Sequence, residues 1–486
     1  MGLLSLILWT PLLGALAILF MPKSAGALAR NAALVASGAS LIGAIYAAMQ
    51  FDPTNAAMQF VERREWVPEM GMSYALGLDG IALAMVLLTT FISFLCILAS
   101  KAETPHVRAY FTWMMVLEAA VIGVFSSLDW FLFYMFWEIT LIPMFFLIGI
   151  WGGARRSAAS LSFFLYTLTG SVFMLLAIVA AYATSPGHSF DMASLAAAAA
   201  GWSTEFQIMV FAGFVIGLGV KVPIFPMHGW LPVAHVEAPV PVSMFLSAVM
   251  LKMGAYGLLR AGVMVPAGLD WFVPALFVLG LINLIYGALL AWKQTDLKAM
   301  VAYSSISHMG FVLIGISAVS VIGISGAVLQ MIAHGIASAA LFYLVGVLYD
   351  RAQTRDVTAF SGLGRQMPIY AVSMSVALLA AMGLPGLAGL VAEFHVIAGA
   401  YARFDLYVLF ISVGVLITAA FTLRTIALLF TGAPDPQFSQ LEDLTLLERA
   451  TALPLVALLL LLGIVPSLAL VLINPAIVSI VDVLGK

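Results

Sequence analysis

The sequence predicts an all-α membrane protein that crosses the bilayer about fourteen times, and its composition and the lengths of its apolar runs support this. Of the 486 residues, 63% are hydrophobic and only 9% are charged, whereas a soluble domain carries about 25% charged residues. The apolar residues form runs of the length that one helix needs to cross a bilayer, about 20 residues. The net charge of −3 indicates no nucleic-acid partner.

Polar breaks divide the chain into fourteen predicted spans. They lie near residues 3–21, 29–50, 79–100, 110–127, 129–150, 160–183, 207–235, 241–263, 272–292, 299–319, 324–349, 368–402, 406–430 and 450–474. The first span lacks the basic start and the A-x-A site of a cleaved signal peptide, so we expect it to be retained. The longest connections, 51–78, 184–206 and 431–449, are too short for a redox or nucleotide-binding domain.

Basic residues divide unevenly between the two sets of connections. With the N-terminus placed outside, one side receives Lys23, Arg30, Lys101, Arg108, Arg155, Arg156, Lys293, Lys298, Arg351, Arg355, Arg365, Arg424 and Arg449. The other side receives only Arg63, Arg64, Arg260, Arg403 and Lys486. Because Lys and Arg favour the cytoplasmic side of a membrane, we expect both termini to face outside.

Two predicted spans are interrupted. Residues 207–235 carry Pro223 and Pro226, and residues 368–402 carry the run Gly383–Gly389 with a proline inside it. Proline removes a backbone hydrogen bond, and such backbone is tolerated at membrane depth only where protein or a water-filled cavity satisfies it. A pair of broken helices in corresponding positions is typical of transporters built from inverted repeats.

The spacing of these breaks predicts four regions along the chain. Residues 1–109 form N-terminal transmembrane helices, and residues 110–263 form a first five-helix repeat with an inward half-channel. Residues 272–430 form a second five-helix repeat with an outward half-channel. Because each repeat has an odd number of helices, the second repeat would be inverted in the membrane relative to the first. Residues 431–486 supply an amphipathic connection and the last transmembrane helix.

Two oppositely charged residues lie deep in apolar segments. Lys221 is the one charge in its run, next to the first break, and Glu138 lies near the middle of its own span. A lysine at the centre of a membrane helix costs roughly 2.5–3.5 kcal/mol, and chains that keep such groups usually move ions past them. We expect the two to form a coupled pair on a proton or cation pathway. The alternative is a static ion pair that ties two helices together.

Four further ionisable residues extend this pathway. Lys252 lies near the centre of its span, and His308 and His334 each stand beside hydroxyls and small residues that leave room for water. Histidine titrates near neutrality, which suits a relay, although a lone membrane histidine can simply bridge two helices. Glu393 follows the second break and is the candidate terminal proton site.

Other candidates are less directly placed. His228, His235 and Glu237 cluster near the basic side and could mark a proton entrance. They could equally resemble a metal site by chance, but three ligands on a proline-rich turn without a fourth are weak evidence for a metal. Glu118 lies within an apolar stretch of the sequence and has no predicted partner. The single cysteine, Cys96, excludes disulfides and cysteine-ligated clusters.

The sequence shows no means of redox chemistry or nucleotide hydrolysis. No Rossmann glycine fingerprint, P-loop, CxxC or haem motif appears. The energy for pumping must therefore come from a partner or from an ion gradient.

Several motifs resemble the signature of the proton-translocating antiporter-like subunits of respiratory complex I, NADH:quinone oxidoreductase. They are Lys221–Pro239, Leu251–Gly257, Ala302–Gly310, Gln330–Gly335 and Leu344–Arg351. The chain is most similar to subunit M, the relative of mitochondrial chain 4, because sister subunits L and N carry a lysine where this chain has Glu393. Phe136–Glu138 and Leu441–Arg449 also fit the M type.

The resemblance implies roles and partners. Glu138 and Lys221 would be the coupled pair and Lys252 the central bridge, with His308 and His334 on the hydrophilic axis. Glu393 would be the terminal proton carrier. The chain itself would hold no cofactor; FMN, iron–sulfur clusters and quinone would belong to other subunits of this translocase. Its partners would be the sister subunits L and N in the lipid bilayer of a bacterial inner (plasma) membrane, with both termini periplasmic.

Three other readings stay open. The chain could belong to a multi-chain cation/proton antiporter or to the membrane arm of a membrane-bound hydrogenase. A purely structural scaffold would leave at least six buried ionisable groups unexplained.

Overall fold

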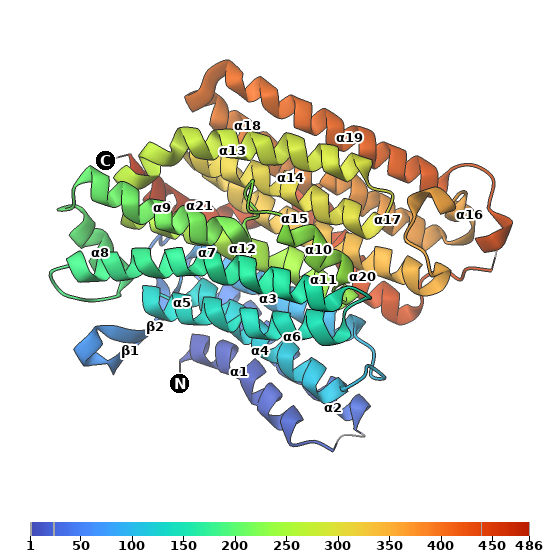
Figure 1. Ribbon diagram of the computed structural model, residues 1–486, viewed down its shortest axis with the longest axis horizontal. Coiled ribbons are helices and arrows are strands. Elements are labelled where there is room, and N and C mark those ends of the chain that lie inside the picture. Colours follow the sequence, from blue (N-terminus) through green and yellow to red (C-terminus); the bar gives the residue numbers. More distant parts are fainter. Residues whose placement is uncertain (1, 23–24, 439, 486) are drawn as a thin grey trace. The chain divides into compact units, whose positions relative to one another are not determined.

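The structure, a computed structural model, describes residues 2–22, 25–438 and 440–485, and these are mostly helical (Figure 1). Within them, thirteen stretches are long and apolar enough to cross a membrane, and Leu3–Leu19 and Pro368–Ala381 are shorter apolar helices. The predicted all-α polytopic fold is confirmed. Lys23 and Lys486, which entered the orientation prediction, lie outside the described residues.

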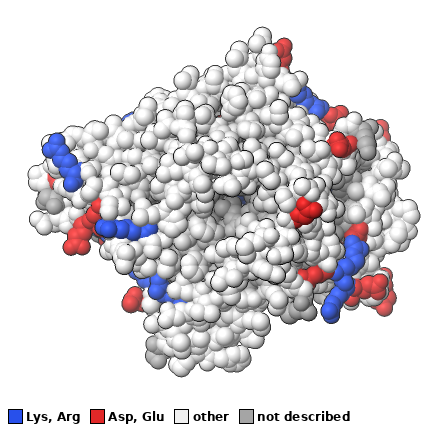
Figure 2. All heavy atoms as spheres, turned by 180° about the vertical axis from the view of Figure 1, so that it is seen from behind, with Lys and Arg blue, Asp and Glu red and all other residues white. Residues whose placement is uncertain are grey.

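Few charged side chains lie on the face drawn in Figure 2, where most atoms belong to uncharged residues. A charged side chain at the centre of a bilayer is costly, so a surface with few charges suits contact with lipid.

The chain forms two compact units, each assembled from more than one segment. The first comprises Met1–Trp230, Val249–Ala275 and Val471–Lys486, and the second comprises Leu231–Ala248 and Leu276–Leu470. Each unit is described by itself below. The division into two inverted five-helix repeats stays a prediction.

The first unit holds most of the N-terminal helices. Its helices and strands are α1 (Leu3–Leu19), α2 (Gly26–Gln50), β1 (Gln59–Val67), β2 (Met72–Leu78), α3 (Gly80–Ala99), α4 (Val107–Ser126), α5 (Trp130–Ile139), α6 (Leu141–Trp151), α7 (Arg156–Thr184), α8 (Met192–Ala199), α9 (Thr204–Lys221), α12 (Leu251–Met264), the start of α13 (Pro266–Lys293) and most of α21 (Ser467–Leu484).

The two strands form an antiparallel hairpin that ties down the start of α1. Glu62 on β1 accepts hydrogen bonds from the backbone N–H groups of Leu4 and Ser5 at 2.7 and 3.1 Å. The first N–H groups of a helix have no partner inside the helix, so this carboxylate serves as the cap of α1. β2 leads directly to Asp79, which caps α3 by accepting from the N–H of Ala82 at 2.9 Å.

The second unit holds the remaining helices. They are α10 (Trp230–Glu237) from its second residue, α11 (Val240–Phe245), the first part of a π-helical turn (Leu246–Met250), the rest of α13, α14 (Leu297–Ser317), α15 (Val321–Ala352), α16 (Leu363–Gln366), α17 (Pro368–Ala381), α18 (Ala388–Phe404), α19 (Leu409–Phe430) and α20 (Leu446–Ile464). One apolar cluster in this unit joins Leu284, Phe311, Ile314, Val396 and Ile411.

Both predicted interruptions are confirmed. α9 ends at Lys221, and the chain does not become helical again until Trp230. In the second unit α17 ends at Ala381 and α18 starts at Ala388. Gly383 and Gly386 in this second break have φ of +80° and +87°, a region that only glycine enters without strain.

The predicted span 129–150 is confirmed as one apolar stretch, Trp130–Trp151. A break at Thr140 divides it into α5 and α6, because Pro143 has no N–H to donate to the carbonyl of Ile139, where α5 ends. The predicted span 450–474 is wrong, because these residues do not form one helix. α20 ends at Ile464, and a further apolar helix, α21, starts beyond Pro466.

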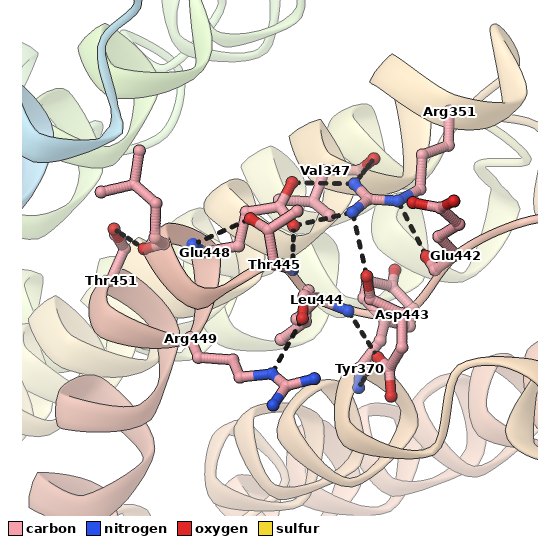
Figure 3. Close-up of polar contacts among 11 residues, drawn as sticks. Val347, Arg351, Tyr370, Glu442, Asp443, Leu444, Thr445, Glu448, Arg449 and Thr451 are labelled. Carbon is pink, nitrogen blue, oxygen red and sulfur yellow. Dashed lines mark hydrogen bonds and ion pairs between the residues drawn. The ribbon is translucent and has the colours of Figure 1, made fainter.

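A polar cluster in the second unit fastens the ends of three helices (Figure 3). Arg351, in the last turn of α15, donates to both carboxylate oxygens of Glu448 on α20 at 2.8 and 2.7 Å and to the carbonyl of Glu442 at 2.9 Å. Asp443, whose carbonyl also accepts from Arg351, accepts in turn from the N–H of Tyr370 at the start of α17 at 3.0 Å. The broken helix α17 is therefore anchored at its intact end.

Replacing Arg351 with glutamine is expected to lower the unfolding free energy by about 1.5–3 kcal/mol, the usual worth of a hydrogen bond to a charged group. The variant loses the two-pronged contact that only a guanidinium can make. Thermal unfolding in detergent measures this. Arg403→Gln, at an exposed position on α18, is the matched control; equal midpoints for the two variants would contradict the anchoring role.

Candidate functional site

The lysine that the sequence places at membrane depth is fully buried in the first unit. Lys221 is 0% exposed and stands in the last turn of α9. Its ammonium lies 3.4 Å from the hydroxyl of Thr140, at the junction of α5 and α6. The rings of Trp137 and Phe163 lie 5.5 and 5.0 Å from it, close enough for cation–π attraction. The ammonium is held by one hydroxyl and two aromatic faces.

Glu138 lies near this lysine. It occupies the last turn of α5, and Lys221 is one of its electrostatic neighbours. Tyr134 and Ser171 are its hydrogen-bonding partners, and its Oε1 atom has no partner among the described residues. The pair therefore combines opposite charges with an oxygen that is free to receive a proton.

Lys252 is also fully buried, on α12 of the first unit. α12 approaches α9 closely, because a side chain at Gly254 would meet the carbonyl of Leu218 at 2.6 Å. The structure therefore places Lys252 on a helix packed directly against the helix that ends in Lys221.

The second unit gathers the other predicted residues around one point. Nδ1 of His308 lies 4.0 Å from Oε1 of Glu393 and 3.3 Å from Nε2 of Gln330. The rings of His308 and His334 are 5.3 Å apart, and Nε2 of His334 is 3.1 Å from the hydroxyl of Ser305. Two histidines and one carboxyl thus stand in a row, from α15 through α14 to α18.

A small cavity adjoins this row. Its volume is about 10 Å³, and Ser304, His308, Gln330 and His334 line its polar side. A polar cavity of this size holds about one water molecule, and a water there would link side chains that do not touch. Gln330 was not predicted; its position four residues before His334 places both on one face of α15.

The candidate entrance residues occupy α10 and the turn before it. His228 belongs to the first unit, whereas His235 and Glu237 belong to the second. His235 is stacked on Phe342, with ring centroids 4.5 Å apart, and Glu237 is an electrostatic neighbour of Lys298. Among the described residues no cluster has the donor set of a metal site.

Two cations that sequence reasoning did not connect hold the end of α10. Lys298 donates to the carbonyls of Val236 and Ala238, and Arg355 donates to that of Val236 at 3.1 Å. Arg355 also pairs with Asp296 at 3.0 Å. These contacts satisfy helix-terminal carbonyls that have no partner within the helix.

A buried ion pair in the first unit was also missed. Arg260 on α12 pairs with the capping residue Asp79 at 2.6 Å and lies over the ring of Tyr256. Sequence reasoning assigned Arg260 to a connection, where no partner is predictable.

Arg260→Gln is expected to destabilise the protein by about 3–5 kcal/mol, because it leaves Asp79 buried without its counter-charge. Asp79→Asn should also be destabilising, because it leaves the guanidinium of Arg260 buried without its counter-charge, although an amide oxygen still caps α3. Thermal unfolding of the two variants measures both losses. Wild-type stability in either variant would contradict the pairing.

Comparison with known proteins places this arrangement in a family. The sequence model of the family described as "NADH:quinone oxidoreductase/Mrp antiporter, TM" matches residues 127–421. The NADH-quinone oxidoreductase subunit M of Rhodobacter capsulatus is 41% identical over 99% of this chain and 96% of its own length. The chain belongs to this family.

Other similar proteins support this family assignment. An NAD(P)H-quinone oxidoreductase chain 4 from a Synechococcus species is 40% identical over 96% of this chain and 90% of its own length. A chain in the structure of respiratory complex I from Thermus thermophilus with bound NADH matches with a TM-score of 0.91 and 28% identity, covering both chains completely. The predicted resemblance to subunit M, as an antiporter-like membrane subunit of complex I, is confirmed.

Proposed function

We propose that this antiporter-like subunit moves protons across the membrane through its buried Glu, Lys and His side chains. The observation that carries the proposal is the fully buried Lys221 beside Glu138, at a point where α5 and α9 both end. A charge held at membrane depth is costly, and a static tie between helices would not need a titratable pair beside interrupted backbone.

The proposed relay has one part in each unit. In the first unit, a proton that arrives at the free oxygen of Glu138 removes the counter-charge of Lys221, so the ammonium releases its own proton more readily. Lys252 receives it as the central bridge. In the second unit, His334 and His308 pass a proton toward Glu393, which delivers it to the outer side. His228, His235 and Glu237 would admit protons from the basic side.

The wider setting follows from the family and is part of the proposal. The chain would sit in a bacterial inner membrane with both termini periplasmic, beside the sister subunits L and N. Residues 110–263 and 272–430 would act as inverted inward and outward half-channels. The chain would do no redox chemistry; FMN, iron–sulfur clusters and quinone in other subunits would supply the energy.

Proton uptake by inverted membrane vesicles tests the proposal. NADH-driven uptake that an uncoupler collapses is the expected result. The family description also names Mrp antiporters, so the alternative is cation/proton exchange without redox coupling. Sodium-dependent proton movement in the absence of NADH would favour that alternative.

A further inference from the structure

One buried carboxyl has no place in the proposed relay. Glu118 lies in the middle of α4, eleven residues after Val107 and eight before Ser126, and is 0% exposed. At about 1.5 Å of rise per residue it is more than 10 Å from either end of its helix. An ionisable residue at this depth is a functional candidate by default.

The surroundings of Glu118 differ from those of the relay carboxyls. Its Oε1 accepts a hydrogen bond from the hydroxyl of Ser37 on α2 at 3.1 Å, and its Oε2 has no partner among the described residues. Glu138 has Lys221 beside it and Glu393 has His308 at 4.0 Å, whereas Glu118 makes no ion pair among the described residues.

The hydroxyl of Ser40, the next one on the same face of α2, makes a hydrogen bond with a purely structural role. Ser40 donates to the carbonyl of Ile7 on α1 at 2.9 Å. Pro11, inside α1, has no N–H to offer that carbonyl, so Ser40 satisfies an acceptor that the proline left open. Both partners of that bond are used, whereas Glu118 keeps one oxygen unused.

We propose that Glu118 is a separate proton-binding site in the N-terminal helices, protonated at neutral pH, with Ser37 as its hydrogen-bond partner. An ionised carboxylate with one hydroxyl donor and no cation would be far more costly in this position than the neutral acid. A tie between α2 and α4 alone would be met by an amide. The hydroxyl of Ser37 can both donate and accept a hydrogen bond. It can therefore relay the proton of Glu118 when that proton exchanges with solvent.

Infrared spectroscopy of the assembled complex in membranes tests this site directly. The difference between wild type and Glu118→Gln should contain a C=O stretching band of a protonated carboxyl that shifts in D₂O. Glu103→Gln, at an exposed loop position, should show no such band. Absence of the band for Glu118→Gln means an ionised group and overturns the proposal, as does a band that never shifts in D₂O.

Ser37→Ala tests the partner. The band should move to higher frequency, because a hydrogen bond to the carbonyl is lost, and its exchange in D₂O should slow; Ser40→Ala should leave it unchanged. An identical response to both serine variants would overturn the assignment of Ser37. If Glu118→Gln fails to assemble, Glu118→Asp keeps a carboxyl and should shift the band. These readouts do not depend on pumping, so they stand or fall separately from the relay.

Discussion

Replacing Glu138 with glutamine, or Lys221 with methionine, is expected to slow proton transfer through this subunit by roughly 10²–10⁴-fold, the usual worth of a positioned proton-transfer group, and so to lower NADH-driven proton uptake strongly. Glutamine keeps the hydrogen bonds to Tyr134 and Ser171 but cannot take a proton. Methionine fills the space between the aromatic rings without a charge. Proton uptake by inverted vesicles measures the effect, and blue-native gels measure assembly.

Stability must be separated from pumping in these variants. Removing one member leaves the other buried without its counter-charge, a cost of roughly 3–5 kcal/mol if the pair is dry. The variant that combines Glu138→Gln with Lys221→Met leaves no unpaired charge at the site. It should therefore assemble at least as well as either single variant while still failing to pump. Glu69→Gln, on the exposed hairpin, is the control. Normal pumping in both single variants would exclude the proposed pathway.

Glu393→Gln is expected to lose pumping, whereas Glu393→Lys should retain more of it. Glutamine preserves shape next to His308 but cannot exchange a proton. Lysine can, and the glycine-containing break from Gly383 to Gly389 offers the polar surroundings that an ion requires. The same vesicle assay decides the order.

The order of the two Glu393 variants carries the conclusion. If glutamine pumps as well as lysine or better, Glu393 is a hydrogen-bonding residue for His308 and the outward path lies elsewhere. His395→Gln, two residues further along α18 and bonded to the carbonyl of Val391 at 2.7 Å, is the matched control and should pump normally.

The span pattern and the chief charged pair were predictable because each leaves a local mark. Lys221 and Glu138 stand out as charges inside apolar runs, and opposite charges at equal depth predict a partnership. The break at Gly383 is marked by its glycines and proline. These signals need no knowledge of how the helices pack.

What was missed depends on contacts between distant segments or on geometry without a residue signature. Gln330 is neutral and draws attention only once His308 is seen beside it. Arg260 and Asp79 are separated by 181 positions, so only the fold brings them together. The π-helical turn before Lys252 follows no residue pattern at all, since an extra residue in one turn changes hydrogen bonding rather than composition.

The order of synthesis sets a limit on how the first unit can be completed. Its last segment, Val471–Lys486, leaves the ribosome after the whole of the second unit. That segment seats against the start of α3, where the carbonyl of Leu472 occupies the space that a side chain at Gly80 would need. Domains generally fold as they leave the ribosome. The start of α3 therefore lacks one of its packing partners until α21 has been synthesised. Gly80→Val should therefore hinder this last step and also lower the stability of the finished protein, because its side chain would collide with the carbonyl of Leu472; thermal unfolding in detergent measures the loss of stability.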